Sequence, residues 1–263
     1  MIIQHHSFFR LTWICAVATL AGGSHAATLT DNFNVNANYL TNGIAGTIWD
    51  GVYFGAGEFN NSGIGGGGPI EDVPVDWVKS LFETNYLGAI RMIQAILPGM
   101  RERRSGAIVN VSSIAGRLAI AGHGHYSAVK HALEAVSEAL AQEVHAFGIR
   151  VALVEPGVVV TPIFTKAKRF ADPGSPYAVH VHRLLLFYQM QMKTPSQPAD
   201  VARVIHEAVT AKEPRLRYLV GDDAERLVAG RQRLTDEEYV ATGRLMPDAE
   251  YLDLMRQRYG FQW

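Results

Sequence analysis

The amino-acid sequence predicts an α/β fold in which helices cover both faces of a parallel sheet. Short apolar runs alternate with longer segments whose apolar residues recur at helical spacing, the pattern of strand–helix–strand units. The apolar runs are nearly continuous, as expected for strands that are buried on both faces. The 263 residues, 48% of them hydrophobic, suffice for one large domain, or for one domain with an appendage.

The predicted elements begin with a helical segment from Asp72 to Arg104, in which Trp77, Leu81 and Ile93 lie near helical spacing. We expect Pro98 to end or bend this helix, because proline lacks the backbone N–H that a helix interior needs. The further elements, in chain order, are a strand over 107–113, a helix over 126–147, a strand over 149–155, a helix over 199–211 and a strand over 216–220.

The first 68 residues differ in composition from the rest of the chain. They contain one of the 24 basic residues, three of the 25 acidic residues and 12 of the 25 glycines. Such a shift indicates two pieces of different origin. Residues 69–263 carry the predicted strands and helices, so we expect the principal domain there.

Residues 1–26 have the pattern of a secretory signal peptide. Arg10 precedes an apolar stretch, Leu11 to Leu20, and the small residues Ser24 and Ala26 fit cleavage after Ala26. The alternative interpretation is a buried N-terminal strand or helix. A signal peptide would imply export from the cytoplasm, with no membrane span left in the mature chain.

Residues 27–68 are rich in Asn and Gly and show no helical period, which predicts short β segments or irregular chain. This stretch resembles the opening of a secreted bacterial β-sandwich of the lectin- or laminin-G-like kind. A carbohydrate-binding module is therefore an alternative, but the stretch is too short to close a sandwich.

Charge, cysteine and histidine content exclude several classes of protein. The formal net charge of −1 does not suggest nucleic-acid binding, and the single cysteine, Cys15, excludes an internal disulfide. The His-x-His pairs at 123 and 125 and at 180 and 182 have no Asp or Glu at the spacing that would complete a metal site. We therefore predict no metal and interpret these histidines as polar lining of a substrate cleft.

Tyr126 and Lys130 carry the first indication of chemistry, since residues at i and i+4 of a helix share one face. A free tyrosine has a pKa of about 10 and is a poor acid or base at neutral pH. A nearby ammonium stabilises the phenolate and lowers that pKa, which suits general acid–base catalysis. By itself the spacing also fits a surface tyrosine beside a solvated lysine.

The surrounding motifs resemble those of the short-chain dehydrogenase/reductases. These motifs are Thr84-Asn85-Tyr86-Leu87-Gly88, the strand ending in Ser112-Ser113, Tyr126-Ser127-Ala128-Val129-Lys130, and Pro156-Gly157 followed by Thr161. The resemblance covers roughly three quarters of the chain and implies a Rossmann-like doubly wound sheet. It further implies a dependence on NAD or NADP, and pairing into homodimers or homotetramers through helices 72–97 and 126–147.

The resemblance also implies a role for each matching residue. Ser113 would orient the substrate oxygen, Tyr126 would donate or accept its proton, and Lys130 would bind the nicotinamide ribose and lower the tyrosine pKa. Asn85 would hold a water in the proton relay. Pro156, Gly157 and Thr161 would pack against the nicotinamide and its amide. The implied reaction interconverts an alcohol and a ketone or aldehyde. Aromatic and apolar residues over 162–193 favour a lipophilic substrate, and a plain packing role for them is equally open.

One part of the family pattern is missing, because the N-terminal strand–helix–strand portion with its glycine-rich turn is absent or replaced. Gly63 to Gly68 satisfies G-x-G-x-x-G, but Pro69 and an acidic segment follow it instead of a helix. Asn61, Ser62 and Gly63 match a family segment that borders the adenosine, so they are candidate cofactor contacts. The alternative function is a catalytically inactive remnant without dinucleotide. The compartment is open too, since nicotinamide enzymes normally work in the cytoplasm.

Overall fold

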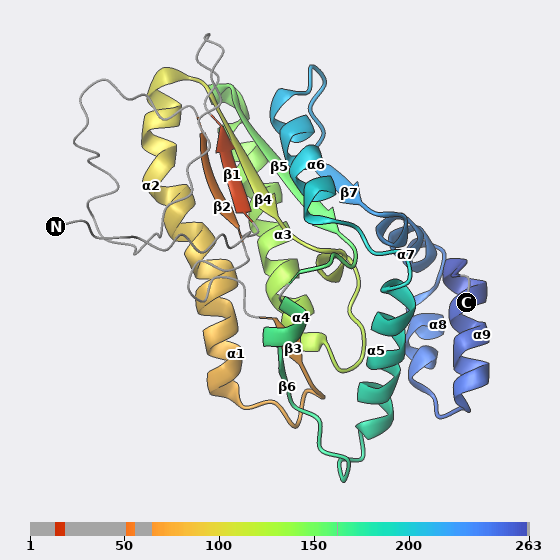
Figure 1. Ribbon diagram of the computed structural model, residues 1–263. Helices are drawn as coiled ribbons and strands as arrows, with labels where there is room; N and C mark the ends of the chain where they lie inside the picture. The colour runs from red at the N-terminus through yellow and green to blue at the C-terminus, as the bar shows by residue number, and fades with distance from the viewer. Residues whose placement is uncertain (1–13, 19–50, 56–64, 162, 262–263) are drawn as a thin grey trace, which may run out of the picture.

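The computed structural model describes residues 14–18, 51–55, 65–161 and 163–261. Within these ranges a central sheet has the strand order β2-β1-β4-β5-β7 and helices on both faces (Figure 1). The strands of this sheet are β1 (Ile14–Ala18), β2 (Gly51–Gly55), β4 (Gly106–Val111), β5 (Ile149–Pro156) and β7 (Arg217–Val220).

The strands β4, β5 and β7 are parallel, which confirms the parallel sheet predicted from the apolar runs. Val111 of β4 is in register with Val154 of β5, and Pro156 of β5 with Val220 of β7. Every residue of β4 is buried, so the continuous apolar run follows from cover on both faces. This register places the carboxyl ends of the three strands at one edge of the sheet.

The two N-terminal strands depart from a purely parallel sheet. β1 is antiparallel to β4, with Ala16 opposite Val109 and Ala18 opposite Ala107, and β2 is antiparallel to β1. Residues 14–18 therefore adopt the strand that the sequence left open as an alternative to a signal peptide. The other residues of 1–26 lie outside the described ranges, and the signal peptide stays a prediction.

The direction of these strands decides where the chain leaves them. Because β1 runs against β4, its last residue, Ala18, lies at the edge of the sheet that holds the amino ends of the parallel strands. β2 runs with β4, so Gly55 lies toward their carboxyl ends. Residues 56–64 are not described. The next described residues, Gly65 and Gly66, line a cavity at that edge of the sheet.

The helices include all those predicted and several that were not. In chain order they are α1 (Val75–Phe82), η2 (Glu83–Leu87), α2 (Gly88–Arg103), η3 (Ile114–Gly116), α3 (Gly124–Val144), η4 (His145–Phe147), α4 (Ile163–Lys166), α5 (Ala178–Gln191), α6 (Pro198–Thr210), α7 (Asp222–Gln232), α8 (Asp236–Val240), η5 (Ala241–Gly243) and α9 (Asp248–Tyr259). A small second sheet pairs β3 (Gly66–Gly67) with β6 (Lys168–Arg169) in parallel.

Pro98 does not end its helix, contrary to one of the two expectations, but lies inside α2. A proline removes one backbone donor and crowds the carbonyl four residues earlier, which destabilises a helix without always ending it. The helix continues to Arg103 and ends where Arg104 takes a left-handed conformation with φ 54°. The Arg104 N–H then donates to the carbonyls of Met100 and Arg101, so the final turn is capped.

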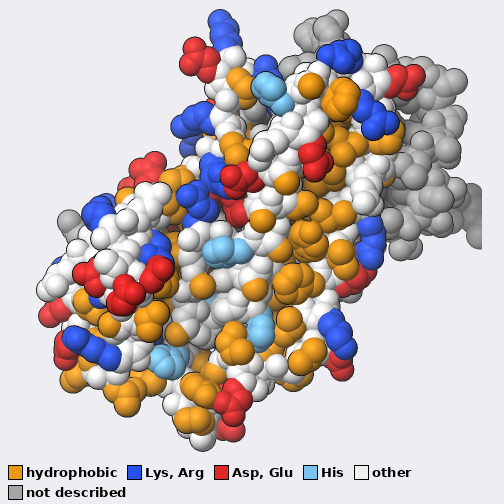
Figure 2. Space-filling view, turned by 180° about the vertical axis from the view of Figure 1, so that it is seen from behind, with side chains coloured by type: hydrophobic (Ala, Val, Ile, Leu, Met, Phe, Trp, Pro, Cys, Tyr) orange, Lys and Arg blue, Asp and Glu red, His pale blue; other side chains and the backbone are white. Residues whose placement is uncertain are grey.

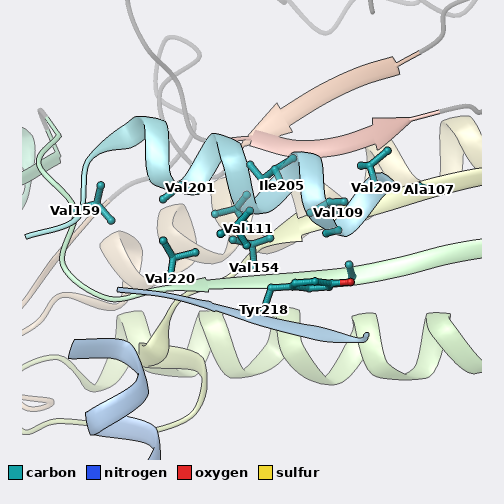
Figure 3. Close-up of a cluster of buried hydrophobic side chains, with 13 residues drawn as sticks. Ala107, Val109, Val111, Val154, Val159, Val201, Ile205, Val209, Tyr218 and Val220 are labelled. Atoms are coloured by element: carbon teal, nitrogen blue, oxygen red, sulfur yellow. The ribbon is translucent and has the colours of Figure 1, made fainter. Parts of the chain in front are cut away.

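Side chains that alternate along the strands form a separate core on each face of the sheet. On one face Val109, Val154 and Tyr218 pack under α6, as Figure 3 shows, with Val201 and Ile205 above them. The other face packs against α2 and α3 through Ile93, Met100, Ile108, Leu140, Val144, Ile149 and Val151. α6 is positioned by Pro198 at its start and by a capping box between Gln197 and Asp200.

A buried polar cluster joins the sheet to α3. Glu155 of β5 is fully buried, and Arg117 Nη1 lies 3.2 Å from each of its carboxylate oxygens. Arg217 Nε of β7 lies 3.1 Å from Glu134 Oε2 and 3.2 Å from Glu155 Oε1. Burial and the nearby Glu134 carboxyl raise the pKa of Glu155 to about 7, against the lowering effect of Arg117.

The surface view agrees with the neutral charge balance. Figure 2 shows basic and acidic side chains interspersed around a band of hydrophobic side chains, with no large field of one sign on that face. Among the described residues, no helix has the length and apolarity to cross a membrane.

The central strand supplies a test of the core. Leu153 of β5 is 0% exposed, so Leu153→Ala should lower the free energy of unfolding by about 2–5 kcal/mol through lost burial and a cavity. Leu245→Ala is the matched control, because Leu245 is 80% exposed and its truncation should change stability by less than about 0.5 kcal/mol. Urea denaturation of both variants measures the difference, and equal effects would contradict the described burial.

The raised pKa of Glu155 predicts how stability depends on pH. Between the ordinary carboxyl pKa of 4.5 and about 7, the folded chain holds a proton that the unfolded chain releases. This group's contribution to stability is therefore present below pH 4.5 and is lost as the pH rises through about 7. Glu155→Gln should flatten that decline in thermal unfolding scans between pH 5 and 7.5, and an unchanged slope would show that Glu155 titrates normally.

Candidate active site

A cavity of about 200 Å³ lies at the carboxyl ends of β4 and β5, where ligands bind in doubly wound sheets. Six residues singled out from the sequence line it: Ser113, Tyr126, Lys130, Pro156, Gly157 and Thr161. They come from three parts of the chain, namely the turn after β4, the start of α3 and the segment after β5. The structure therefore brings most of the predicted site together.

Ser113 sits at the sharp turn where the chain leaves β4. Its backbone is extended, and its hydroxyl caps η3 by accepting the Ala115 N–H at 3.1 Å. The same Oγ lies 3.5 Å from the Pro156 carbonyl oxygen, at the end of the neighbouring strand. The Ser113 side chain also lowers the pKa of Tyr126, against the effect of burial. The cap thus holds the serine beside the tyrosine.

Tyr126 lies in the first turn of α3 with its ring between two neighbours. The His123 ring stacks on it with centroids 4.7 Å apart and 18° between the planes, and Lys130 Nζ lies 5.7 Å from the ring centroid. Burial raises the pKa of Tyr126 to about 12, and the hydrogen bond with Ser113 opposes this rise. The pKa of Tyr126 is therefore raised, whereas the sequence predicted that Lys130 would lower it. The loss of water destabilises the phenolate more than its neighbours stabilise it.

Lys130 is almost fully buried, with 2% of its surface exposed. Its ammonium donates to the Val111 carbonyl oxygen at 3.0 Å, which ties the start of α3 to the end of β4. Burial lowers the pKa of Lys130 to about 8, while the charge of Glu134 raises it. The lysine therefore carries its charge below that pH, close to the tyrosine ring.

The segment after β5 is held rigidly by backbone hydrogen bonds. The Gly157 N–H donates to the Val220 carbonyl at 3.0 Å, and the Val158 N–H donates to the Asp223 carboxylate at 2.7 Å. A Cβ at position 157 would lie 2.2 Å from that carboxylate, so only glycine fits. Pro156, Gly157 and Thr161 thereby form one wall of the cavity.

The remaining walls are mainly apolar and aromatic. Ile114, Leu118, Ile120, Ile163, Phe164, Leu184, Phe187 and Tyr188 supply most of this surface. The Tyr188 hydroxyl lies 3.4 Å from both ring nitrogens of His123, and its ring meets Phe164 edge-to-face at 5.4 Å. Burial lowers the pKa of His123 to about 4, so its ring is neutral at pH 7.

The four histidines considered as polar lining separate in the structure. His123 lines the cavity, as expected, whereas His180 lines a second cavity between α5 and the C-terminal helices. His182 is exposed and pairs with Asp248 at 2.8 Å. His125 lies outside the set that lines either cavity. Across the described ranges, no group of three or more His, Cys, Asp or Glu side chains could hold a metal ion.

One predicted site residue, Asn85, stands apart from the cavity. Asn85 is buried in η2, a π-helical turn between α1 and α2 that packs against α3, and it does not line the cavity. π-turns often occur at functional sites. Asn61, Ser62 and Gly63 lie outside the described residues, so their predicted cofactor contacts stay a prediction.

The arrangement fits the nicotinamide half of a dinucleotide. Lys130 and Tyr126 face Pro156, Gly157 and Thr161 across one cavity, with a serine hydroxyl beside the phenol. Such a site can hold a carbonyl oxygen between two hydroxyls and move a proton to or from it. A hydride transfer at such a site would need a cofactor, since no side chain supplies a hydride.

Comparison with known proteins supports this assignment. The sequence profile of the short chain dehydrogenase family matches residues 59–172, beginning before Pro69 and including Asn60 to Gly63. An uncharacterized oxidoreductase of Schizosaccharomyces pombe is 32% identical over 188 residues, which cover 70% of this chain and 78% of that protein. A 3-ketodihydrosphingosine reductase of Bacteroides thetaiotaomicron is 38% identical over 62% of this chain and 61% of its own length.

A solved structure shows the same relationship. The crystal structure of a short-chain dehydrogenase from Streptomyces avermitilis is 35% identical to this chain, covers 75% of it and 69% of its own chain, and gives a TM-score of 0.58. The cavity joins the serine, tyrosine and lysine of that family's pattern at the expected edge of a doubly wound sheet. The chain belongs to the short-chain dehydrogenase/reductase family of oxidoreductases.

Proposed function

We propose that the protein is an NAD- or NADP-dependent oxidoreductase that interconverts a lipophilic alcohol and its ketone or aldehyde. One observation carries this proposal: Ser113, Tyr126 and the buried Lys130 line one mainly apolar cavity, with Lys130 Nζ 5.7 Å from the centroid of the Tyr126 ring. Acid–base chemistry on a substrate oxygen needs a proton donor, a hydroxyl that positions the oxygen, and a positive charge that stabilises the donor after it loses its proton. Tyr126, Ser113 and Lys130 would supply these three in turn.

The proton is the part of the reaction that this chain performs. The nicotinamide of the cofactor, when bound, supplies or accepts the hydride. With its pKa raised to about 12, Tyr126 is protonated at neutral pH and thus in the state that donates to a carbonyl oxygen during reduction. Ser113 would hold that oxygen beside the phenol. In oxidation the phenolate must form, and the Lys130 charge is the group that favours it.

The walls of the cavity favour an apolar substrate. Leu118, Phe164, Leu184 and Phe187 would remove hydrocarbon surface from water, at roughly 25 cal/mol per Å² buried. Polar residues such as His123, Thr161 and Arg169 also line the cavity, but apolar side chains are the larger part of its wall. The 3-ketodihydrosphingosine reductase among the relatives carries a lipid ketone in its name, which agrees with this substrate class.

A catalytically inactive remnant is the second candidate, and the direction of β1 favours it. A doubly wound dinucleotide site has a parallel strand beside β4 that leads into the glycine-rich turn at the active-site edge. In this chain the strand beside β4 is antiparallel, and its last residue lies at the opposite edge. Such a chain would keep the nicotinamide-side contacts of Lys130 and Gly157 but would bind a dinucleotide weakly.

Removal of one oxygen atom tests the role of Tyr126. Tyr126→Phe should lower turnover of a lipophilic ketone with NADPH or NADH by at least about 100-fold, because general acid catalysis typically contributes that much. The fold should survive, since the ring and its stacking on His123 remain. Tyr177→Phe is the control, as that exposed hydroxyl binds Glu71 away from the cavity. Near-normal turnover in Tyr126→Phe would remove Tyr126 from the mechanism.

Direct titration separates the two candidate functions. NADH and NADPH should each be added to the purified full chain while nicotinamide fluorescence and the melting temperature are followed. Saturable binding should raise the melting temperature, because a ligand that binds only the folded state stabilises it. Lys130→Met should weaken that binding, since it removes the cation expected at the ribose. No saturable binding of either dinucleotide would leave the remnant as the function of this chain.

A further inference from the structure

The buried charge of Lys130 raises the question of what stabilises it. An ammonium that is 2% exposed and donates to one backbone carbonyl has lost most of its hydration. Isolated buried charges are costly and are normally paired. Among the carboxylates of α3, Glu134 lies one helical turn beyond Lys130 on the same face, and it is 4% exposed.

The position of Glu134 is fixed by its surroundings. A Cβ at Gly116 would lie 2.8 Å from Glu134 Cγ, 2.9 Å from Ser112 Oγ and 3.1 Å from the Lys130 carbonyl oxygen. Glu134 is therefore packed against the turn that carries Ser113. Its Oε2 accepts from Arg217 Nε at 3.1 Å, while no hydrogen bond to Oε1 occurs within the described part of the chain.

Glu155, on β5, links Glu134 to the part of the sheet that carries Pro156 and Gly157. It is fully buried next to Glu134, shares Arg217 with it and is bound by Arg117. The next residues are Pro156 and Gly157, which line the cavity. The buried carboxyls thus connect α3, which carries Lys130, to the end of β5, which lines the cavity.

We propose that Glu134 is a positioning residue of the site, whose buried carboxylate, one helical turn beyond Lys130 and next to Glu155, stabilises the Lys130 ammonium in its contact with the end of β4. This inference rests on the proposed function for its catalytic meaning, but its physical content does not need the cofactor. The charged groups around Glu134 are Lys130 and Glu138 on α3, Glu155 on β5, Arg217 on β7 and Arg117 after η3.

Glu134 and Glu138 form a matched pair of variants. Both accept hydrogen bonds from Arg217, at 3.1 and 3.0 Å, and they lie one turn apart on α3. The Glu138 side chain is 54% exposed, whereas that of Glu134 is 6% exposed. Loss of the buried Glu134 carboxylate should therefore change the pKa of Lys130, whereas loss of the exposed Glu138 carboxylate should not, because solvent screens its charge.

Lysine side-chain NMR on the full chain tests the proposal without any cofactor. The chain has six lysines (Lys79, Lys130, Lys166, Lys168, Lys193 and Lys212), and the signal missing from Lys130→Met identifies Lys130. Glu134→Gln should lower the titration midpoint of Lys130 by about 1 pH unit, because a close opposite charge is lost. Glu138→Gln should leave it within about 0.3 of a unit. Equal midpoints in the two variants would overturn the proposal.

A reciprocal measurement covers the case in which Glu134→Gln does not fold. Coupling between two sites is mutual, so removal of the lysine charge must raise the midpoint at which the Glu134 carboxyl titrates. Carbon-13 labelling of glutamate carboxyls in Lys130→Met reports this, and an unchanged Glu134 midpoint would overturn the proposal. Failure of NADH and NADPH to bind, with both couplings present, would reject the proposed function and leave the role of Glu134 intact.

Discussion

The parallel register of β4 and β5 is the constraint on which the site depends. Because Val111 is opposite Val154, Ser113, two residues beyond β4, comes level with Pro156, the last residue of β5. Ser113 then comes within 3.5 Å of the Pro156 carbonyl, and the Val111 carbonyl is left to accept the Lys130 ammonium. A shift by one residue would turn every buried side chain of a strand to the other face, so the core and the site require the same register.

Burial sets the chemical state of the residues that this register brings together. Removal of water raises the pKa of Tyr126 and lowers that of Lys130, and both shifts favour the neutral forms. Opposing them are the hydrogen bond from Ser113 and the charge of Glu134. Polar groups around the cavity therefore oppose the effect that burial has on the pKa values of Tyr126 and Lys130.

Local patterns in the sequence predicted those parts that local chemistry determines. The apolar strands, the i,i+4 pair on α3 and the glycine after β5 were all predictable, since periodicity and close packing leave few alternatives. The proximity of Glu134 and Glu155 could not be predicted from local patterns, because the two residues are 21 positions apart, one on a helix and the other on a strand. The helices α7 and α9 were also missed, as much of the surface of each is polar and their contact is tertiary.

The direction of the strand beside β4 distinguishes this sheet from a purely parallel one. The chain after a strand can reach the active-site edge only if that strand ends there. β1 is antiparallel to β4, so its last residue, Ala18, lies at the edge of the sheet far from Lys130 and Tyr126. β2 ends toward the near edge, and the chain that follows it, residues 56–64, contains Asn61 to Gly63 before Gly65 enters the cavity. Of the two N-terminal strands, only β2 therefore ends at the edge of the sheet that holds the cavity.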